Sequence, residues 1–211
     1  MSTLVDKIVS EIRDDILNGV LLPAQALKQV ELANRYGVSP IPLREALQRL
    51  QVDGLVEYFP YRGAIVARIR RSEIVDIADL RIALETMALK LTVGALDEEQ
   101  IERMDEVASR LSGPESNTPK VFMDLLLSFY SILLARSNRP LLLNMIQTNL
   151  KRATLYYAEL IKHPLRASLP APTWQQIATA IRAGDTDLTI RYMNERVISF
   201  RDFFLEHSSI E

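Results

Sequence analysis

The chain has 211 residues, of which 48% are hydrophobic, no cysteine, and a formal net charge of −2. The hydrophobic content is sufficient for packed cores, and the length exceeds that of most single domains, so we expect two domains. Without cysteine, disulfides, thiol nucleophiles and thiolate metal ligands are excluded. Because the sequence shows no apolar signal segment and no long uncharged apolar run, we expect a protein of the cytoplasm.

Charge is divided unequally along the chain. Residues 1–71 carry a net charge of +2, and residues 72–211 carry −4. Local cationic stripes, rather than the total charge, set the potential that phosphates meet. The basic excess therefore favours a nucleic acid as the partner of the first part.

A helix-turn-helix is predicted between Gln29 and Gly54. Gly37 follows a short helical segment and permits the positive φ of a tight turn. Ser39 can then accept from first-turn N–H groups, and Pro40 and Pro42 remove donors that would lack partners. At about 100° per residue, the second helix has a packing face and an opposite polar face that is free to read DNA. The packing face carries Leu43, Ala46, Leu47 and Leu50.

A β-hairpin is predicted directly after this helix. Gly54 ends the helix, and residues 55–59 and 64–68 are β-favouring runs that flank Pro60-Tyr61-Arg62-Gly63. A hairpin in this position is the wing of a winged helix-turn-helix. We therefore place a DNA-binding domain at residues 1–69 and a linker at 70–72.

The remainder, residues 73–211, is predicted to be an all-α bundle. Its helical periodicity is interrupted at glycine and proline clusters, and no convincing strand is present. Thr173 and Gln176 have the spacing of a capping box. The fold class is mainly α: an N-terminal winged helix-turn-helix with a small β-hairpin wing, followed by a helical bundle. The expected helices span residues 72–93, 97–111, 119–136, 140–162, 173–183 and 186–206.

Both parts resemble a known family. Residues 4–69 resemble the winged-helix domain of the GntR regulators in the run VSPIPLREAL and in a wing ending in Gly-x-x-Val. The later part resembles the FCD effector domain of the FadR-type subfamily in the runs DLRIALE, SNRP and IATAIRAGD. The resemblance implies a homodimer that binds a palindromic double-stranded DNA operator, with a small-molecule effector pocket inside the bundle.

The resemblance also implies which residues contact the operator. Ser39 and Arg44 would act through the recognition helix, and Gly63 would approach the adjacent minor groove. Pro40 stands where the family usually has Arg, and Ile41 where it often has Thr, so a guanine-reading contact worth about 1–3 kcal/mol is lost. Ile41 could instead contact a thymine methyl group. The candidate DNA-binding residues are Arg35, Ser39, Ile41, Arg44, Gln48, Arg49, Arg62 and Gly63.

The effector domain departs from its family at the metal site. Many FCD domains hold a metal through one Asp and three His, and the matching positions here are Leu126, Tyr130, Trp174 and Arg196. We therefore expect no metal cofactor. Arg81 and Arg196 lie on apolar helix faces, and buried cations need partners. We predict a metal-independent pocket for a small carboxylate or similar anion, lined by Arg81, Tyr130, Trp174 and Arg196.

Other interpretations stay open. Glu85 can neutralise Arg81 as an i,i+4 pair, and Tyr130 and Trp174 can be core aromatics with no ligand. For the whole chain, a helical interaction module with degenerate DNA binding is the alternative that Pro40 favours. An enzyme is disfavoured, because no nucleotide-binding glycine cluster and no hydrolase or zinc-protease motif is present.

Overall fold

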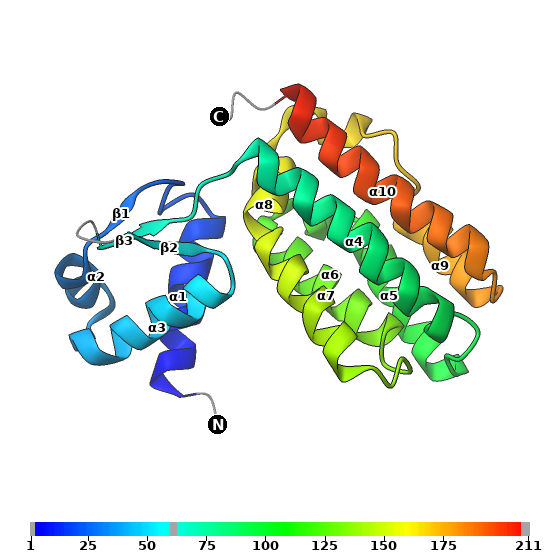
Figure 1. Cartoon of the computed structure of the whole chain (residues 1–211), viewed down its shortest axis with the longest axis horizontal. Coiled ribbons are helices and arrows are strands. Elements are labelled where there is room, and N and C mark those ends of the chain that lie inside the picture. The colour runs from blue at the N-terminus through cyan, green and yellow to red at the C-terminus, as the bar shows by residue number, and fades with distance from the viewer. Residues whose placement is uncertain (1–2, 60–62, 208–211) are drawn as a thin grey trace. The chain divides into compact units, whose positions relative to one another are not determined.

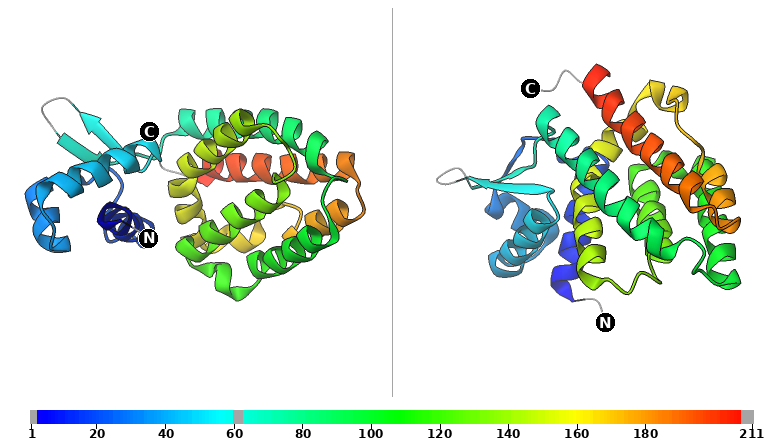
Figure 2. Two further views of the ribbon diagram at one scale, coloured as in Figure 1. Left: turned by 90° about the horizontal axis from the view of Figure 1, so that it is seen from below. Right: turned by 45° about the vertical axis from the view of Figure 1, so that its right-hand side comes forward.

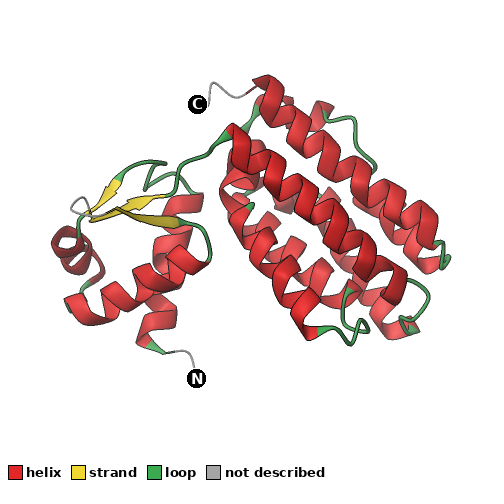
Figure 3. Cartoon of the chain, viewed as in Figure 1, coloured by secondary structure: helices red, strands yellow, loops and turns green. Residues whose placement is uncertain are grey.

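A computed structural model describes residues 3–59 and 63–207 of the chain. Its contacts separate two compact units, residues 1–69 and 70–211. Each is described by itself, with elements labelled as in Figure 1. Among the described residues, strands are found only in the first unit (Figure 3), so the predicted fold class is confirmed. Within the described ranges, no helix is long and apolar enough to span a membrane.

The first unit is a winged helix-turn-helix. Its elements are α1 (Leu4–Leu17), β1 (Ala26–Leu27), α2 (Gln29–Tyr36), α3 (Pro40–Val52), β2 (Val56–Phe59) and β3 (Gly63–Val66). A capping box of Thr3 and Asp6 starts α1, which packs on α3. The predicted packing face of α3 is fully buried, at Leu43, Ala46, Leu47 and Leu50. This face anchors α3 and leaves its opposite side to solvent.

The sheet has one strand more than the predicted hairpin. The order is β1-β3-β2 and both pairings are antiparallel, with Leu27 opposite Ala64 and Val56 opposite Val66. A two-residue strand such as β1 is too short to produce a periodic pattern. Its pairing with β3 is a tertiary contact that local sequence does not encode.

The second unit is an all-α bundle, and Figure 2 shows α10 running beside α4. Its α-helices are α4 (Arg71–Thr92), α5 (Glu98–Ser112), α6 (Pro119–Leu133), α7 (Pro140–Arg152), α8 (Thr154–Lys162), α9 (Trp174–Arg182) and α10 (Thr186–His207). Two 3₁₀ turns lie between them, η1 (Pro114–Asn117) and η2 (Pro164–Ser168). The predicted capping box is present at the start of α9, where Thr173 accepts from the N–H of Gln176.

The single helix predicted over residues 140–162 was wrong. The structure has two helices there, α7 and α8, which meet at Ala153. Five consecutive residues of α8, from Thr154 to Ala158, are buried. If α7 continued straight through these residues, one side of each helical turn would face solvent, as it does in α7. Burial of all five residues therefore fits a helix axis that changes direction at Ala153.

The junction residues 70–72 are ordered on the bundle. Arg71 and Ser72, predicted as linker, are the first residues of α4. The hydroxyl of Tyr156 accepts from the backbone N–H of Arg70 at 3.1 Å. It also lies 3.2 Å from the Arg70 carbonyl and 3.2 Å from a Glu73 carboxylate oxygen. Tyr156 therefore fixes the first residues of the second unit against α8.

Candidate functional site

The outward face of α3 presents the side chains predicted to read DNA. Gly37, at φ +63°, ends α2 in the left-handed conformation that the turn requires. On α3, Ile41 is 82% exposed, and Arg44 and Gln48 are also exposed. The three side chains thus form a continuous exposed strip at helical spacing.

The capping bond predicted for Ser39 was wrong. Ser39 has the extended backbone of an N-cap residue, but its side chain makes no capping hydrogen bond. A serine cap bonds the N–H of the second or third helical residue. The third residue here is Pro42, which has no N–H. The exposed hydroxyl of Ser39 is therefore left available to an outside partner.

Among the candidate arginines, Arg44 differs from its neighbours. Arg35 pairs with Asp15 at 2.7 Å. Arg49 pairs with both Asp6 and Glu45 at 2.7 Å. Within the described residues, Arg44 has no carboxylate at ion-pair distance. A phosphate would have to compete with carboxylates for Arg35 and Arg49, but not for Arg44.

The wing is described only in part. Gly63 is exposed and begins β3 at φ +75°, and a Cβ there would meet no atom within 4 Å. The backbone conformation, rather than a lack of space, therefore favours glycine. Arg62 lies outside the described residues. The assignments of all eight candidate residues to DNA contact stay predictions.

A cavity of about 190 Å³ lies inside the second unit. The four predicted effector residues, which come from different helices, all line it: Arg81 from α4, Tyr130 from α6, Trp174 from α9 and Arg196 from α10. The structure therefore brings together side chains that are up to 115 positions apart in sequence. Their role in effector binding stays a prediction.

Arg81 is already neutralised within the protein. Its Nε donates to Glu85 at 2.7 Å, its Nη1 to the Tyr157 hydroxyl at 2.5 Å, and its Nη2 to the Tyr130 hydroxyl at 2.7 Å. Tyr130 in turn donates to Glu85 at 2.6 Å. Burial alone would lower the pKa of Arg81, but the charge of Glu85 and the two tyrosine oxygens raise it well above its ordinary value. The i,i+4 interpretation of this pair is confirmed.

Arg196 has a different environment. Its guanidinium carbon lies 4.1 Å from the centre of the Trp174 ring, and Nη1 donates to the carbonyl of Pro172. Burial lowers the pKa of Arg196 to about 10, and the charges of Arg81 and Arg166 act in the same direction. No carboxylate in the described part of the chain pairs with it. The group is a desolvated cation that lacks an anionic partner, which is costly unless a ligand supplies one.

Two further polar residues of the cavity were not predicted from the sequence. Arg166, on η2, donates to Asn117 Oδ1 at 2.9 Å and to Ser116 Oγ at 3.1 Å. Tyr157 stacks on Phe200 with ring centres 4.3 Å apart. Arg166 follows a His-Pro break and has no helical periodicity to place it. Tyr157 lies in α8, which the sequence analysis joined to α7 as a single helix.

The residues at the family's metal positions do not suit a metal. Leu126 is a fully buried hydrocarbon, and Tyr130, Trp174 and Arg196 offer a neutral phenol, an indole and a cation. Zn²⁺ and similar ions need imidazole, thiolate or carboxylate ligands. Within the described ranges, no group of three or more His, Cys, Asp or Glu residues could hold one.

Protein-family models match both units. The model of bacterial regulatory proteins of the gntR family matches residues 4–66, and the FCD domain model matches residues 76–197. Two relatives come from Escherichia coli (strain K12). The HTH-type transcriptional regulator McbR is 26% identical over 146 residues, covering 69% of this chain and 66% of that protein. The HTH-type transcriptional repressor GlaR is 34% identical over 82 residues, covering 39% of this chain and 37% of that protein.

The match to curated relatives is partial in length. Three further regulators that the chain matches are covered over 43%, 45% and 37% of their own lengths. Each of the relatives compared is named as a transcriptional regulator or repressor, and none as an enzyme.

Solved structures share the fold of the whole chain. The structure of E. coli McbR/YncC gives a TM-score of 0.76 at 21% identity, covering 98% of this chain and 100% of that one. A GntR transcriptional regulator from Rhodococcus sp. RHA1 gives 0.75 at 19% identity, covering 97% and 98%. At these identities the likeness concerns fold alone. Together with the two matching family models, it leads to one conclusion: the chain belongs to the gntR family of bacterial regulatory proteins and carries an FCD domain.

Proposed function

We propose that this protein is a DNA-binding transcriptional regulator whose operator affinity is set by a small anion bound in the FCD cavity. The carrying observation for DNA binding is the outward face of α3, where Arg44 is free of carboxylates and the Ser39 hydroxyl has no capping bond. Arginine reads guanine with two parallel hydrogen bonds, and a serine hydroxyl can serve a base or a phosphate. Because such a protein acts where the chromosome is, we place it in the cytoplasm.

The proposed effector site is the cavity around Arg196. A part-buried guanidinium stacked on Trp174 presents its donors in a fixed plane, the arrangement that suits a carboxylate. The family's metal donors are replaced, so this site would take its anion without a metal. The positive charge that a metal would bring is supplied by arginine.

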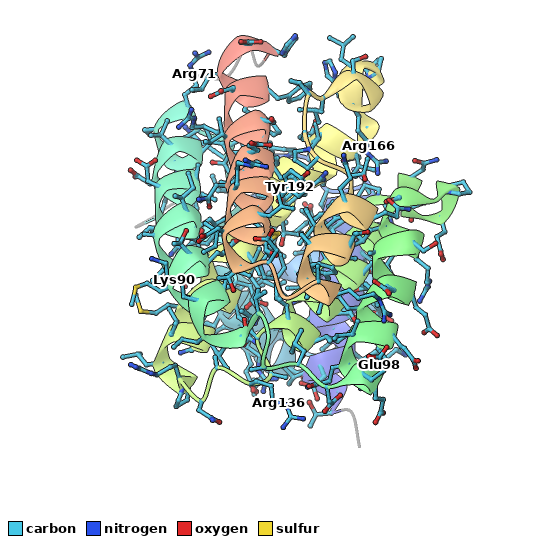
Figure 4. The ribbon with its side chains drawn as sticks, turned by 90° about the vertical axis from the view of Figure 1, so that its right-hand side faces the viewer. Arg71, Lys90, Glu98, Arg136, Arg166 and Tyr192 are labelled. Carbon is cyan, nitrogen blue, oxygen red and sulfur yellow. The ribbon has the colours of Figure 1, made fainter. Side chains whose placement is uncertain are left out.

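We also propose a homodimer formed through α4. The helix has an exposed stripe at helical spacing, with Leu80 50% and Met87 57% exposed. Asp76 and Lys90 each lie seven residues from Ala83, and Leu80 and Met87 lie three and four residues from it. Lys90 is labelled in Figure 4. Two α4 helices packed antiparallel about a two-fold axis at Ala83 would set Leu80 against Met87 and Asp76 against Lys90 of the second copy. This self-complementary pattern fits a second copy of the chain.

The test of the proposed function is duplex binding. Fluorescence anisotropy with fragments flanking its own gene should give a tighter complex than shuffled duplexes of the same composition, at both low and moderate salt. If binding is equal on all sequences and vanishes at moderate salt, the protein has no sequence-specific operator among these fragments. A chain that remains dimeric yet binds no duplex would support the alternative, a helical interaction module.

A further inference from the structure

The charges around the cavity do not balance. Three guanidinium groups line it, those of Arg81, Arg166 and Arg196, and none of the described lining residues is acidic. Glu85 lies behind the lining and neutralises Arg81. Two positive charges are therefore left over.

The two remaining arginines have only neutral partners among the described residues. Arg196 donates to a backbone carbonyl, and Arg166 donates to the Asn117 amide oxygen and a Ser116 hydroxyl. Burial lowers the pKa of each. A bound anion would improve the environment of both groups, because a charge-assisted hydrogen bond is stronger than a neutral one.

The two arginines also come from different elements. Arg196 is on α10, one turn before Phe200, whereas Arg166 is on η2, where Figure 4 labels it. Phe122 lies under Arg166 at 5.6 Å, and Trp174 lies under Arg196 at 4.1 Å. Each guanidinium is thus held by its own ring. An anion with two charged groups could therefore give each guanidinium its own partner.

The size of the cavity suits a small ligand. Its volume of about 190 Å³ is somewhat larger than that of an apolar cavity of about 150 Å³ that binds benzene. A short aliphatic chain with a charged group at each end therefore fits this space. The walls of the cavity include Leu111, Leu160, Ile161 and Met193, which would contact the hydrocarbon part.

We propose that the cavity selects a small aliphatic dianion with separated charges, a dicarboxylate, held at one end by Arg196 and at the other by Arg166. The proposal rests on the effector function proposed above and adds to it a ligand charge and a second binding residue. A dicarboxylate neutralises both residual charges, whereas a monocarboxylate leaves one partly buried cation without an anionic partner.

The test compares each dicarboxylate with its own monoamide, which has nearly the same shape and one charge fewer. Malonate, succinate and adipate, each beside its monoamide, are titrated calorimetrically into the full chain in the presence of a chelator. For the dicarboxylate of best length, we expect affinity at least about tenfold above that of its monoamide. In Arg166→Gln the preference should fall to within about twofold, while the monoamide still binds.

Arg196→Gln provides the matched comparison, because it should weaken acid and monoamide alike. Circular dichroism and melting temperature establish that both variants are folded. Equal affinity of acid and monoamide in the unmodified protein would overturn the dianion and leave the anion pocket standing. If inorganic phosphate binds and the dicarboxylates do not, one compact anion is the ligand and the proposal is wrong. If no anion of the series binds, the anion pocket itself fails.

Discussion

Arg81 and Glu85 form a salt bridge of 2.7 Å one turn apart on α4, with side chains 3% and 2% exposed. Tyr130 bridges the pair by accepting from Arg81 and donating to Glu85. The first arginine that the sequence suggests as an effector ligand is therefore a satisfied structural group. Its role at the cavity is to fix the hydroxyl positions of Tyr130 and Tyr157.

Removing the carboxylate should strongly destabilise the bundle. Glu85→Gln leaves the charge of Arg81 buried without its anion, and we expect a loss of about 3–5 kcal/mol in the free energy of unfolding. Urea denaturation measures it. The double variant Arg81→Met, Glu85→Leu removes both charges and should lose less than Glu85→Gln alone. If the double variant loses as much stability as the single variants Arg81→Met and Glu85→Leu lose together, the two side chains are not coupled.

The missing cap at Ser39 predicts a small effect on stability and a large one on binding. Ser39→Ala should change the free energy of unfolding by less than about 0.5 kcal/mol, because no hydrogen bond is removed. Thr173→Ala, which removes a real capping bond at the start of α9, should cost about 1 kcal/mol. Operator affinity should fall in Ser39→Ala and stay constant in Thr173→Ala. Equal losses of stability in both would show that Ser39 caps α3 in solution.

Arg44 and Arg62 should differ in how they contribute to DNA binding. Arg44→Ala should weaken binding to the operator by about 1–3 kcal/mol and binding to random duplex much less. Arg62→Ala should weaken both and reduce the salt dependence by about one phosphate contact. Anisotropy titrations at several salt concentrations separate the two effects. Similar losses on every sequence for both variants would reject base reading by Arg44.

The lowered pKa of Arg196 predicts a pH dependence for anion binding. The pKa of about 10 belongs to the unliganded folded protein, so Arg196 is charged at neutral pH and loses its proton as the pH rises through about 10. Carboxylate affinity should be constant between about pH 7 and 9 and then fall. Calorimetry at increasing pH measures it, with Arg196→Gln as the reference whose residual affinity stays level. A flat profile through pH 11 for the unmodified protein would show that burial does not lower the pKa of Arg196 to this range.

A charge placed in the α4 stripe should dissociate the dimer. Leu80→Glu would put a like charge at both symmetry-related positions in apolar surroundings, and we expect the dimer dissociation constant to rise by about tenfold or more. Sedimentation equilibrium measures it. Ile198→Glu adds the same charge at an exposed position of α10, away from the stripe, and should leave the dimer intact. If Leu80→Glu stays dimeric, the two-fold interface lies elsewhere.

Much of the outward face of α3 could be predicted from the sequence, because it depends on local rules. The apolar spacing of α3 and the turn at Gly37 are encoded within about a dozen residues, and so is the capping box of Thr173. The missing cap at Ser39 was partly visible in the sequence, since Pro42 removes one of the two N–H groups that a serine cap can bond. Inward-facing positions on separate helices, together with the family resemblance, were enough to predict four of the cavity residues.

The break between α7 and α8 and the position of Arg166 at the cavity depend on tertiary packing. Ala153 is a good helix former, and no glycine or proline marks the end of α7. The break arises because the bundle buries α8 on nearly every side, which no local pattern records. Arg166 lies in a short 3₁₀ turn, where neither helical nor strand periodicity says which way a side chain points. The charge balance of the cavity depends on this residue, so it could not be predicted from the sequence.

The neighbouring tyrosines of α8 give that helix two attachments. Tyr157 lines the cavity and accepts a hydrogen bond from Arg81. The hydroxyl of Tyr156 accepts from the backbone N–H of Arg70, the first residue after the winged-helix unit. A rigid helix cannot rotate one of these side chains without carrying the other along. A ligand that displaces Tyr157 by turning α8 would therefore also displace Tyr156 and its hydrogen bonds to the backbone of Arg70.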